Sequence, residues 1–307
     1  MINSKHPYYS ANDFFREKLN SKVIKISIDG GFTCPNRDGT LSDRGCIFCS
    51  ARGSGDFAGN RCESIEKQIE KGKALLSKKW DNGVYMAYFQ AYTNTYGSID
   101  YLKRVYNTAL MQPDIVALSI ATRPDCINEE IVALIKDLSE RAYVCVELGL
   151  QTVNEKTVKL INRCYENEAY IKAMKLLEKA DIDVITHVII GLPGEGFNDY
   201  MDTINFAVAN KTSGLKLQLL HILRGTQLYD MYRENEFYVY DLDTYVKTIA
   251  DIIERIPQNI VIHRITGDGP RDILVAPDFT RNKRLVLNSI HKEFVTRGTY
   301  QGYFIEK

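Results

Sequence analysis

The stretch VIKISIDGGFTCPNRDGTLSDRGCIFC, residues 23–49, says most about the fold, because an apolar strand pattern leads directly into a loop with three cysteines. Cys34, Cys46 and Cys49 lie among Gly, Pro and Asp residues. Three thiolates can hold three irons of a four-iron cluster and leave the fourth iron open, whereas a structural site closes its coordination with a fourth Cys or His. The loop therefore predicts a metal centre with an open position for chemistry.

Two other uses of these cysteines have to be considered. A structural zinc site usually shows two close ligand pairs, but only Cys46 and Cys49 form such a pair, and no His lies nearby. Disulfides are disfavoured because seven cysteines are an odd number in a chain of 307 residues that opens MINSKHPYYS, without an apolar signal segment. A zinc-binding structural or interaction protein remains the alternative from a different class.

The cysteine spacing resembles that of a known family. Eleven residues separate Cys34 from Cys46, two separate Cys46 from Cys49, and the aromatic Phe48 precedes the last cysteine. This pattern resembles the cluster loop of radical S-adenosylmethionine (SAM) enzymes. The resemblance implies a [4Fe-4S] cluster that binds SAM, and an electron donor such as flavodoxin or ferredoxin. One electron would then generate a 5′-deoxyadenosyl radical from SAM.

The first gap between cysteines is longer than the three-residue form common in that superfamily. It is similar to the gap in the subgroup of the catalytic subunit of Elongator and its bacterial relatives, many of which act on tRNA. Three further motifs occur in the order which that subgroup shows: GLQT at 149–152, NR at 162–163 and HVIIGLPGE at 187–195.

Composition is typical of a globular protein with one large domain, or one with a small extension, since 45% of the residues are apolar and 25% are charged. The longest apolar runs, such as VYMAYFQAY and DVITHVIIGL, fall far short of the roughly 18–20 residues of a membrane span. We therefore expect no membrane contact and a cytoplasmic location, where thiols stay reduced.

Strand-like and helix-like segments alternate along the chain. Apolar or β-branched runs predict strands at 23–28, 84–89, 115–120, 143–150, 183–190 and 215–220. Helical periodicity predicts helices at 64–80, 98–111, 128–142, 170–180 and 197–210, with Asn128 as an N-cap. This alternation predicts parallel strands with right-handed crossovers. The expected fold class is α/β, a partial (β/α)6 TIM-like barrel, which the family resemblance also implies.

The pattern changes near residue 225. Residues 1–225 are predicted to form the barrel with its cluster loop, and residues 226–307 a C-terminal α/β extension. The extension contains a helical pattern at 241–256, a strand pattern at 259–266 and a basic helical end. Because no Pro/Gly linker separates the two parts, we expect the extension to pack on the barrel.

Candidate cofactor-binding residues follow the ends of predicted strands, where a barrel gathers its chemistry. Gln90 and Tyr92 follow the second strand, where the family meets the methionine amino group, although FQAYTNTYG departs from the familiar Gly-Gly-Glu form and ordinary strand-end packing is equally compatible. Glu147 and Gln151 project from alternate positions of the fourth strand and can face the barrel mouth together. The resemblance implies that Gln151 lies near the ribose.

Two later motifs add candidates for SAM. Arg163 is a candidate for the methionine carboxylate, because a guanidinium matches a carboxylate in geometry and charge. Its neighbour Cys164 stands where relatives usually have Gly. Ile190 and Gly191 belong to the run that resembles the adenine-binding strand, where a glycine lets a flat base approach the main chain.

The chain has a formal net charge of +0, but its C-terminal part is locally basic. The basic residues between 279 and 300 face a single acid, Glu293: Arg281, Lys283, Arg284, Lys292 and Arg297. Such a face could meet phosphates or could be an ordinary solvated helix surface. The loop at 264–272 holds Arg264, Asp268 and Arg271, which could bind an anionic group or form a glycine turn held by an Asp–Arg pair.

The resemblance to the Elongator subgroup implies tRNA as a partner, and the basic segment 281–297 agrees with it. Within the resemblance, the most concrete reaction is modification of a 5-substituted wobble uridine, for example conversion of 5-carboxymethylaminomethyluridine to 5-aminomethyluridine. There Arg264 and Arg271 could grip the substrate carboxylate. A free small-molecule or peptide substrate is the alternative, and for it the basic face would be idle.

The remaining Cys and His residues carry no predicted chemistry. Buried, inert thiols are expected for the cysteines without pair spacing, which are Cys62, Cys126, Cys145 and Cys164. Satisfied core or strand-end histidines are expected in apolar strand contexts, at His187, His221 and His263.

Overall fold

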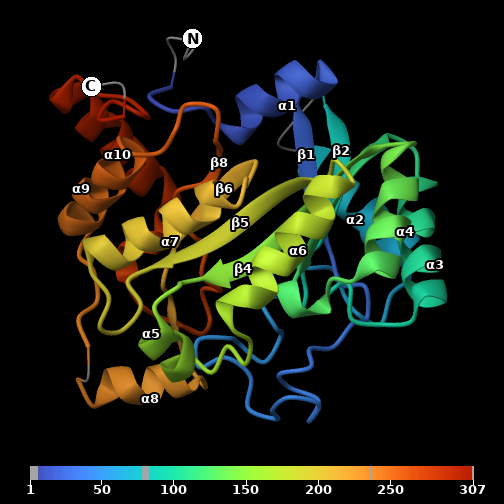
Figure 1. Cartoon of the computed structure of the whole chain (residues 1–307), viewed down its shortest axis with the longest axis horizontal. Helices are drawn as coiled ribbons and strands as arrows, with labels where there is room; N and C mark the ends of the chain where they lie inside the picture. Colours follow the sequence, from blue (N-terminus) through green and yellow to red (C-terminus); the bar gives the residue numbers. More distant parts are fainter. Residues whose placement is uncertain (1–5, 78–82, 236, 306–307) are drawn as a thin grey trace.

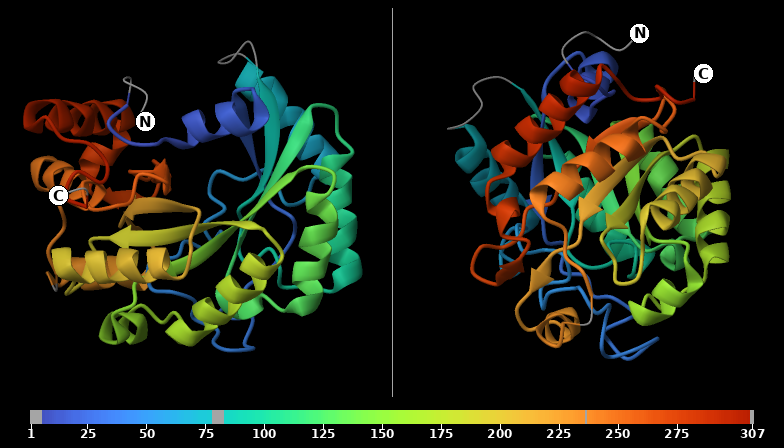
Figure 2. Two further views of the ribbon diagram at one scale, coloured as in Figure 1. Left: turned by 45° about the horizontal axis from the view of Figure 1, so that its top comes forward. Right: turned by 90° about the vertical axis from the view of Figure 1, so that its left-hand side faces the viewer.

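The computed structural model describes residues 6–77, 83–235 and 237–305. These residues form one curled sheet of seven parallel strands in the order β1-β2-β3-β4-β5-β6-β8, with helices on its outer side (Figures 1 and 2). The strands are β1 (Val23–Ile28), β2 (Val84–Phe89), β3 (Ile115–Thr122), β4 (Tyr143–Gln151), β5 (Asp183–Ile190), β6 (Gly214–Leu219) and β8 (Val261–Arg264). The predicted partial barrel of the α/β class is confirmed.

Alternation of side chains in the strands separates the inside of the barrel from its outer layer. In β1, Ile24, Ile26 and Ile28 are buried, whereas Lys25 and Ser27 project to the interior cavity of the barrel. Ile26 and Ile28 pack in the main hydrophobic core between sheet and helices. Because side chains alternate with a period of two, each strand presents one row to the helices and one to the cavity.

Helices cross over between consecutive strands. They are α2 (Ile65–Ser77), α3 (Ile99–Leu110), α4 (Glu129–Ser139), α6 (Asn167–Lys179) and α7 (Phe197–Ala209). Asn128 caps α4 as predicted, since its side chain accepts from the Ile131 N–H. Residues 78–80 of the helix predicted at 64–80 lie outside the described residues.

Several short elements had not been expected. They are α1 (Ala11–Leu19), α5 (Glu155–Leu160), α8 (Gln227–Arg233) and a two-stranded antiparallel sheet of β7 (Ile222–Leu223) and β9 (Leu274–Ala276). Their apolar stretches are too short to show a clear period. They matter for the site because β9 holds the 268–271 loop beside the mouth of the barrel.

The C-terminal part continues the barrel. Strand β8, predicted as part of the extension, pairs with β6 in parallel and becomes the seventh strand of the sheet. Helices α9 (Leu242–Ile253) and α10 (Lys283–Arg297) pack against each other beside it (Figure 1). The domain boundary at residue 225 stays a prediction. No helix in the described ranges is long and apolar enough to cross a membrane.

Candidate functional site

A cavity of about 950 Å³ occupies the inside of the barrel. Inward side chains from all seven strands line it, together with the cysteine loop and the segments at 268–271 and 280–283. This volume is at the upper end of the range for small-molecule and cofactor sites. The barrel therefore offers one large site, open where the strands end.

Cys34, Cys46 and Cys49 all line this cavity, and no other cysteine among the described residues does. Turns in the loop aim them inward. The Cys49 N–H donates to the Cys46 carbonyl over 3.0 Å, and the Arg37 N–H donates to the Cys34 carbonyl over 2.8 Å. Gly45 has a φ of +74° and lies so close to Arg37 that a Cβ there would come within 2.8 Å of the Arg37 Nε. A side chain at that position would be strained.

Two asparagines fasten this loop to the end of α5. Asn36 Nδ2 donates to the Asn162 carbonyl over 2.6 Å, and Asn162 Nδ2 donates to the Gly45 carbonyl over 2.7 Å. The Ile47 N–H also donates to the Ile161 carbonyl over 3.2 Å. Sequence reasoning used the NR motif at 162–163 for its order along the chain and for Arg163, so the anchoring role of Asn162 was missed.

The three cysteines are partly exposed, but the surrounding protein still disfavours the charged form of two of the thiols. Burial raises the pKa of the Cys46 thiol to about 12, although Arg123 opposes the shift. Burial likewise raises the pKa of the Cys49 thiol, and Arg37 opposes it. Metal ligands must be deprotonated thiolates, so binding at this loop would release protons. In the described part of the chain, no three His, Cys, Asp or Glu side chains are grouped closely enough to hold a single metal ion.

The residues after β2 support the cysteine loop. Tyr92 has a φ of +61°, its hydroxyl donates to the Ala51 carbonyl over 2.7 Å and its N–H donates to the Gly53 carbonyl over 2.8 Å. Gln90 lines the cavity beside it. Tyr92 therefore holds the chain that follows Cys49, while the Gln90 side chain is available to a ligand.

At the end of β4, Gln151 faces the cavity and has a φ of +63°. Its amide lies 3.0 Å from the hydroxyl of Tyr165, another residue of the cavity wall. Phe48 also lines the cavity, between the last two cysteines. These three side chains surround the mouth next to the cysteine loop.

The structure gives Arg163 a different position from the one predicted. Its guanidinium donates to the carbonyls of Leu150, Thr152 and Tyr165 and to the side chain of Asn167. The residue is only 1% exposed. A guanidinium with all of its nitrogens engaged has no donor left for a methionine carboxylate. Arg163 ties the end of β4 to the following loop.

Neighbouring Cys164 has a φ of +60°, the left-handed region that favours glycine. The glycine that the family resemblance implies at this position would adopt this conformation without strain. A cysteine there carries backbone strain, of the order of 1 kcal/mol.

Glu147 is the centre of a buried polar network on the floor of the cavity. Ser119 Oγ donates to its Oε1 over 2.7 Å, and Lys25 Nζ lies 3.2 Å from the same oxygen. His187 Nε2 lies 2.8 Å from Oε2, which also accepts from Lys216 Nζ. Lys216 further contacts the Tyr88 hydroxyl over 3.2 Å. Alternation along the fourth strand suggested a cofactor contact for Glu147, but its carboxylate is occupied by these groups.

The positive and negative charges of the network around Glu147 do not balance. Burial opposes ionisation of Glu147, but Lys216 and Lys25 overcome it and hold the pKa of the carboxyl well below its ordinary value. Burial, followed by the Lys216 charge, lowers the pKa of His187 to about 4, so this imidazole is neutral near pH 7. Two lysines therefore share one carboxylate, and burial lowers the pKa of Lys216 to about 7 although the Glu147 charge opposes the shift.

Ile190 and Gly191, which were predicted to bind adenine, do not line the cavity. Ile190 is fully buried in the core between sheet and helices, and Ile189 lines the cavity instead. Gly191 has a φ of +96°, and its N–H donates to the Tyr200 hydroxyl over 3.2 Å. The alternation of β5 side chains explains the difference of one residue.

The predicted substrate residues divide into two groups. Arg264, Asp268, Arg271, Arg281 and Lys283 line the cavity, whereas Arg284 is exposed on α10 outside it. Asp268 pairs with Lys283 over 2.6 Å, which does not match the alternative of an Asp–Arg pair within the 264–272 loop.

Arg281 also has internal partners. It donates to Asp278 over 2.8 Å and to the carbonyls of Arg271 and Leu274. It holds the 268–274 segment in place, and its guanidinium is largely occupied.

Some minor expectations need correction. Cys145 is buried as predicted, but Cys62 is exposed and Cys126 and Cys164 are partly exposed. The Nε2 of His221 and the Nδ1 of His263 are buried and have no hydrogen-bond partner among the described residues, so these histidines are not fully satisfied. Both residues line the cavity.

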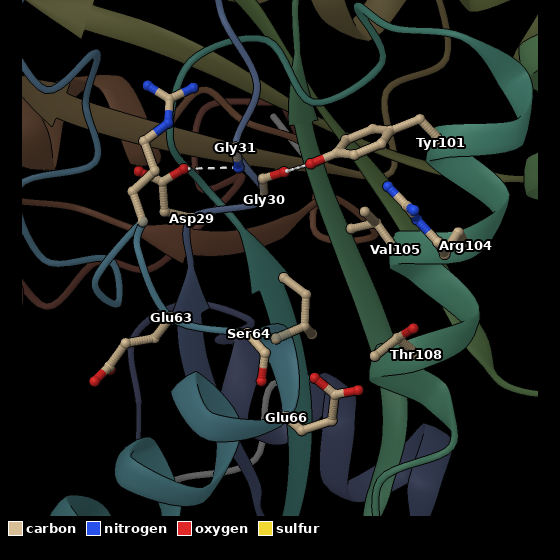
Figure 3. A pocket seen from close by; sticks show the side chains of 12 residues that line it. Asp29, Gly30, Gly31, Glu63, Ser64, Glu66, Tyr101, Arg104, Val105 and Thr108 are labelled. Carbon is tan, nitrogen blue, oxygen red and sulfur yellow. Dashed lines mark hydrogen bonds between the residues drawn. The ribbon is translucent and has the colours of Figure 1, made fainter.

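A second cavity, of about 300 Å³, lies outside the barrel between the segment after β1 and helices α2 and α3 (Figure 3). Tyr101 donates to the Gly30 carbonyl over 2.7 Å, and the Gly31 N–H donates to Asp29 over 2.9 Å. None of the residues predicted for the site lines it. The candidate site is therefore the barrel interior.

Comparison with known proteins agrees with this geometry. Residues 39–207 match the family model of the radical SAM superfamily, and residues 212–296 match that of the radical SAM C-terminal domain. Proteins of this superfamily use a [4Fe-4S] cluster and SAM, which overturns the zinc-protein alternative. The residues present fit such a cluster, since the thiols of Cys34, Cys46 and Cys49 line the cavity. The cavity is also large enough to bind a small molecule beside them.

Individual relatives place the chain more closely. Protein YtqA of Bacillus subtilis is 43% identical over 305 residues, 99% of this chain and 95% of the relative. The tRNA uridine(34) acetyltransferase of Methanocaldococcus infernus is 30% identical over 164 residues, 52% of this chain and 30% of the relative. The solved structure of archaeal Elp3 from Methanocaldococcus infernus superimposes with a TM-score of 0.67 at 20% identity, and covers 91% of this chain and 64% of that chain. The chain belongs to the radical SAM superfamily, and about half of it is similar in sequence to Elongator complex protein 3 and to tRNA uridine(34) acetyltransferases.

Proposed function

We propose that the protein is a radical SAM enzyme that modifies a 5-substituted wobble uridine of tRNA. The observation that carries the proposal is the charge of the cavity. Among the described residues that line it, nine are Lys or Arg and three are Asp or Glu, although the whole chain has a formal net charge of +0. A cavity of one sign attracts a substrate of the opposite sign. Relatives named as acting on tRNA uridine support nucleic acid as that substrate.

In this proposal Cys34, Cys46 and Cys49 hold the cluster. When bound, the cluster supplies the electron that cleaves SAM and gives the radical used on the substrate. Gln90 and Gln151 orient SAM from the strand ends, and Phe48 packs beside it. Tyr92, Asn36 and the other loop contacts keep the thiols aimed into the cavity. A cytoplasmic flavodoxin or ferredoxin is the proposed electron donor.

The proposed reaction converts 5-carboxymethylaminomethyluridine and water to 5-aminomethyluridine and glyoxylate. The carboxymethyl carbon next to nitrogen would lose a hydrogen atom to the deoxyadenosyl radical and one electron to the oxidised cluster, and water would hydrolyse the resulting imine. Deleting the gene should leave the carboxymethylated nucleoside in bulk tRNA and remove the aminomethyl product and nucleosides derived from it. Mass spectrometry of nucleosides from wild-type and deletion cells measures this. Complementation with the wild-type gene should restore the product, and complementation with Cys46→Ala should not. Identical nucleoside profiles would count against tRNA and favour a free small molecule or peptide.

Binding of tRNA should depend on exposed cations at the cavity mouth and on α10. Arg271 and Arg284 are both exposed, whereas Arg281 and Lys283 already hold the 268–283 segment together. We expect Arg271→Glu with Arg284→Glu to weaken tRNA binding at every sequence and to reduce the slope of log K against log salt by about 1 per lost phosphate contact. The matched control is Arg104→Glu, an exposed arginine of α3. An unchanged salt slope would exclude these contacts.

Gln151 and Arg163 should respond differently to substitution by alanine. Gln151→Ala removes one neutral hydrogen-bonding group, so SAM affinity should fall by roughly 2- to 10-fold while stability changes little. Arg163→Ala leaves several buried carbonyls without donors, so the free energy of unfolding should fall by about 3 kcal/mol or more. Calorimetric titration with SAM and urea denaturation separate the two. A stable Arg163→Ala variant with weakened SAM binding would restore the original role of Arg163.

A further inference from the structure

The floor of the cavity carries positive charge that its own residues do not neutralise. Lys25 and Lys216 share the single carboxylate of Glu147, and His187 is kept neutral. Arg264 adds a third cation on the same wall. Within the described ranges, the Arg264 guanidinium has neither a hydrogen-bond nor an ion-pair partner. Unpaired charge in a poorly solvated cavity is unfavourable unless an anion joins it.

These cations lie at one depth inside the barrel. Lys216 and Arg264 are register partners on β6 and β8. Lys25 lies three residues before Ile28, the last residue of β1, and Lys216 lies three residues before Leu219, the last residue of β6. A strand rises about 3.3 Å per residue, so these cations lie roughly 10 Å below the strand ends. The cysteine loop and Gln151 lie at those ends, above the floor.

We propose that Arg264, Lys25 and Lys216 form a recognition site for a carboxylate carried by the substrate. This inference rests on the proposed function. It identifies the carboxylate as the part of the substrate that binds at the floor of the cavity. Arg264 supplies the free guanidinium fork, and the two lysines supply the charge that Glu147 leaves unbalanced. Glu147 fixes the lysines in place, and the neutral His187 donates or accepts without adding charge.

The chemistry of the site favours a carboxylate over a phosphate. A planar monoanion matches the guanidinium fork. A phosphate dianion would lie near the carboxylate of Glu147, which would repel it more strongly. The methionine part of SAM also carries a carboxylate, but it belongs near the thiols at the strand ends. The floor is therefore assigned to the substrate, and the test separates these sources.

The test uses the cluster-loaded protein under anaerobic conditions. Acetate, acetamide and inorganic phosphate are compared at equal ionic strength by the shift of the thermal unfolding midpoint, since a ligand that binds the native state stabilises it. We expect acetate to stabilise the wild type more than acetamide or phosphate does. Arg264→Gln should lose that stabilisation, Lys25→Gln should reduce it, and Arg104→Gln, a control outside the barrel, should keep it.

Two further readouts identify the source of the carboxylate. Arg264→Gln should bind SAM as the wild type does, and should raise the KM for tRNA carrying 5-carboxymethylaminomethyluridine by roughly 10- to 100-fold, as expected for one lost charge-assisted contact. A fall in SAM affinity instead would assign the arginine to the cofactor and overturn the proposal. Acetate stabilisation equal in wild type and Arg264→Gln, or no stabilisation, would also overturn it, as would stronger stabilisation by phosphate.

The results also distinguish failure of the proposed function from failure of the carboxylate site. If the wild type does not act on this tRNA, but acetate stabilises it in an Arg264-dependent manner, the carboxylate site stands and the tRNA assignment falls. If the wild type acts on the tRNA and Arg264→Gln has an unchanged KM, the tRNA assignment stands and the carboxylate site falls.

Discussion

Replacing Cys34, Cys46 or Cys49 by alanine is expected to reduce cleavage of SAM to the level of a reaction without protein. Each thiol lines the same side of the barrel cavity, and each would hold a different iron of the cluster. No neighbouring thiol lines the cavity among the described residues, so none can take over. Iron and sulfide content after anaerobic reconstitution, together with release of 5′-deoxyadenosine, measures the effect.

Cys62→Ala is the matched control for these variants. Cys62 is exposed and lies outside the cavity, so its removal should leave cluster content and SAM cleavage as in the wild type. If one of the three loop variants retained full cleavage, that cysteine would not be a ligand.

Substitution of Glu147 by leucine should give the largest loss of stability. Its carboxylate is the shared partner of Lys25, Lys216 and His187, and its side chain has no exposed surface. Removing one partner of a buried ion pair leaves an uncompensated charge and costs about 3–5 kcal/mol. Urea denaturation of the cluster-free protein should show this loss in the free energy of unfolding. Glu166→Leu, at an exposed position, provides the control.

A second substitution tests the cause of that loss. Combining Glu147→Leu with Lys216→Met removes the most buried of the stranded charges, so the double variant should be more stable than Glu147→Leu alone. A double variant as unstable as the sum of both single variants would show that the two residues do not form a coupled pair. The network would then have no role in holding the lysines on the cavity floor.

The barrel strands could be predicted from the sequence because each lies on a buried face with a plain apolar pattern. The predicted bounds of β1, β2 and β5 agree with the structure residue for residue. In contrast, α5 and β7 are too short for periodicity to appear. The role of β8 also depends on long-range pairing with β6, which no local pattern encodes.

Site residues could be predicted from the sequence where a short motif identifies them, and could not be predicted where their role depends on contacts between distant segments. The cysteine loop could be recognised from the spacing of its cysteines, and all three of them line the cavity. Arg163 could not be assigned, because its partners are backbone carbonyls brought together by folding. Lys25 and Lys216 gave no signal either, since a lysine in a strand resembles any solvent-facing residue until the barrel closes around it.

The measurement that tests the central claim most directly combines the anaerobically loaded protein with SAM, a reductant and tRNA from the deletion strain. The account predicts that 5′-deoxyadenosine and 5-aminomethyluridine appear together, that 5-carboxymethylaminomethyluridine is consumed in equal amount, and that Cys46→Ala yields neither product. Formation of 5′-deoxyadenosine with no change in any tRNA nucleoside would contradict the account. The substrate would then have to be sought among small molecules or peptides.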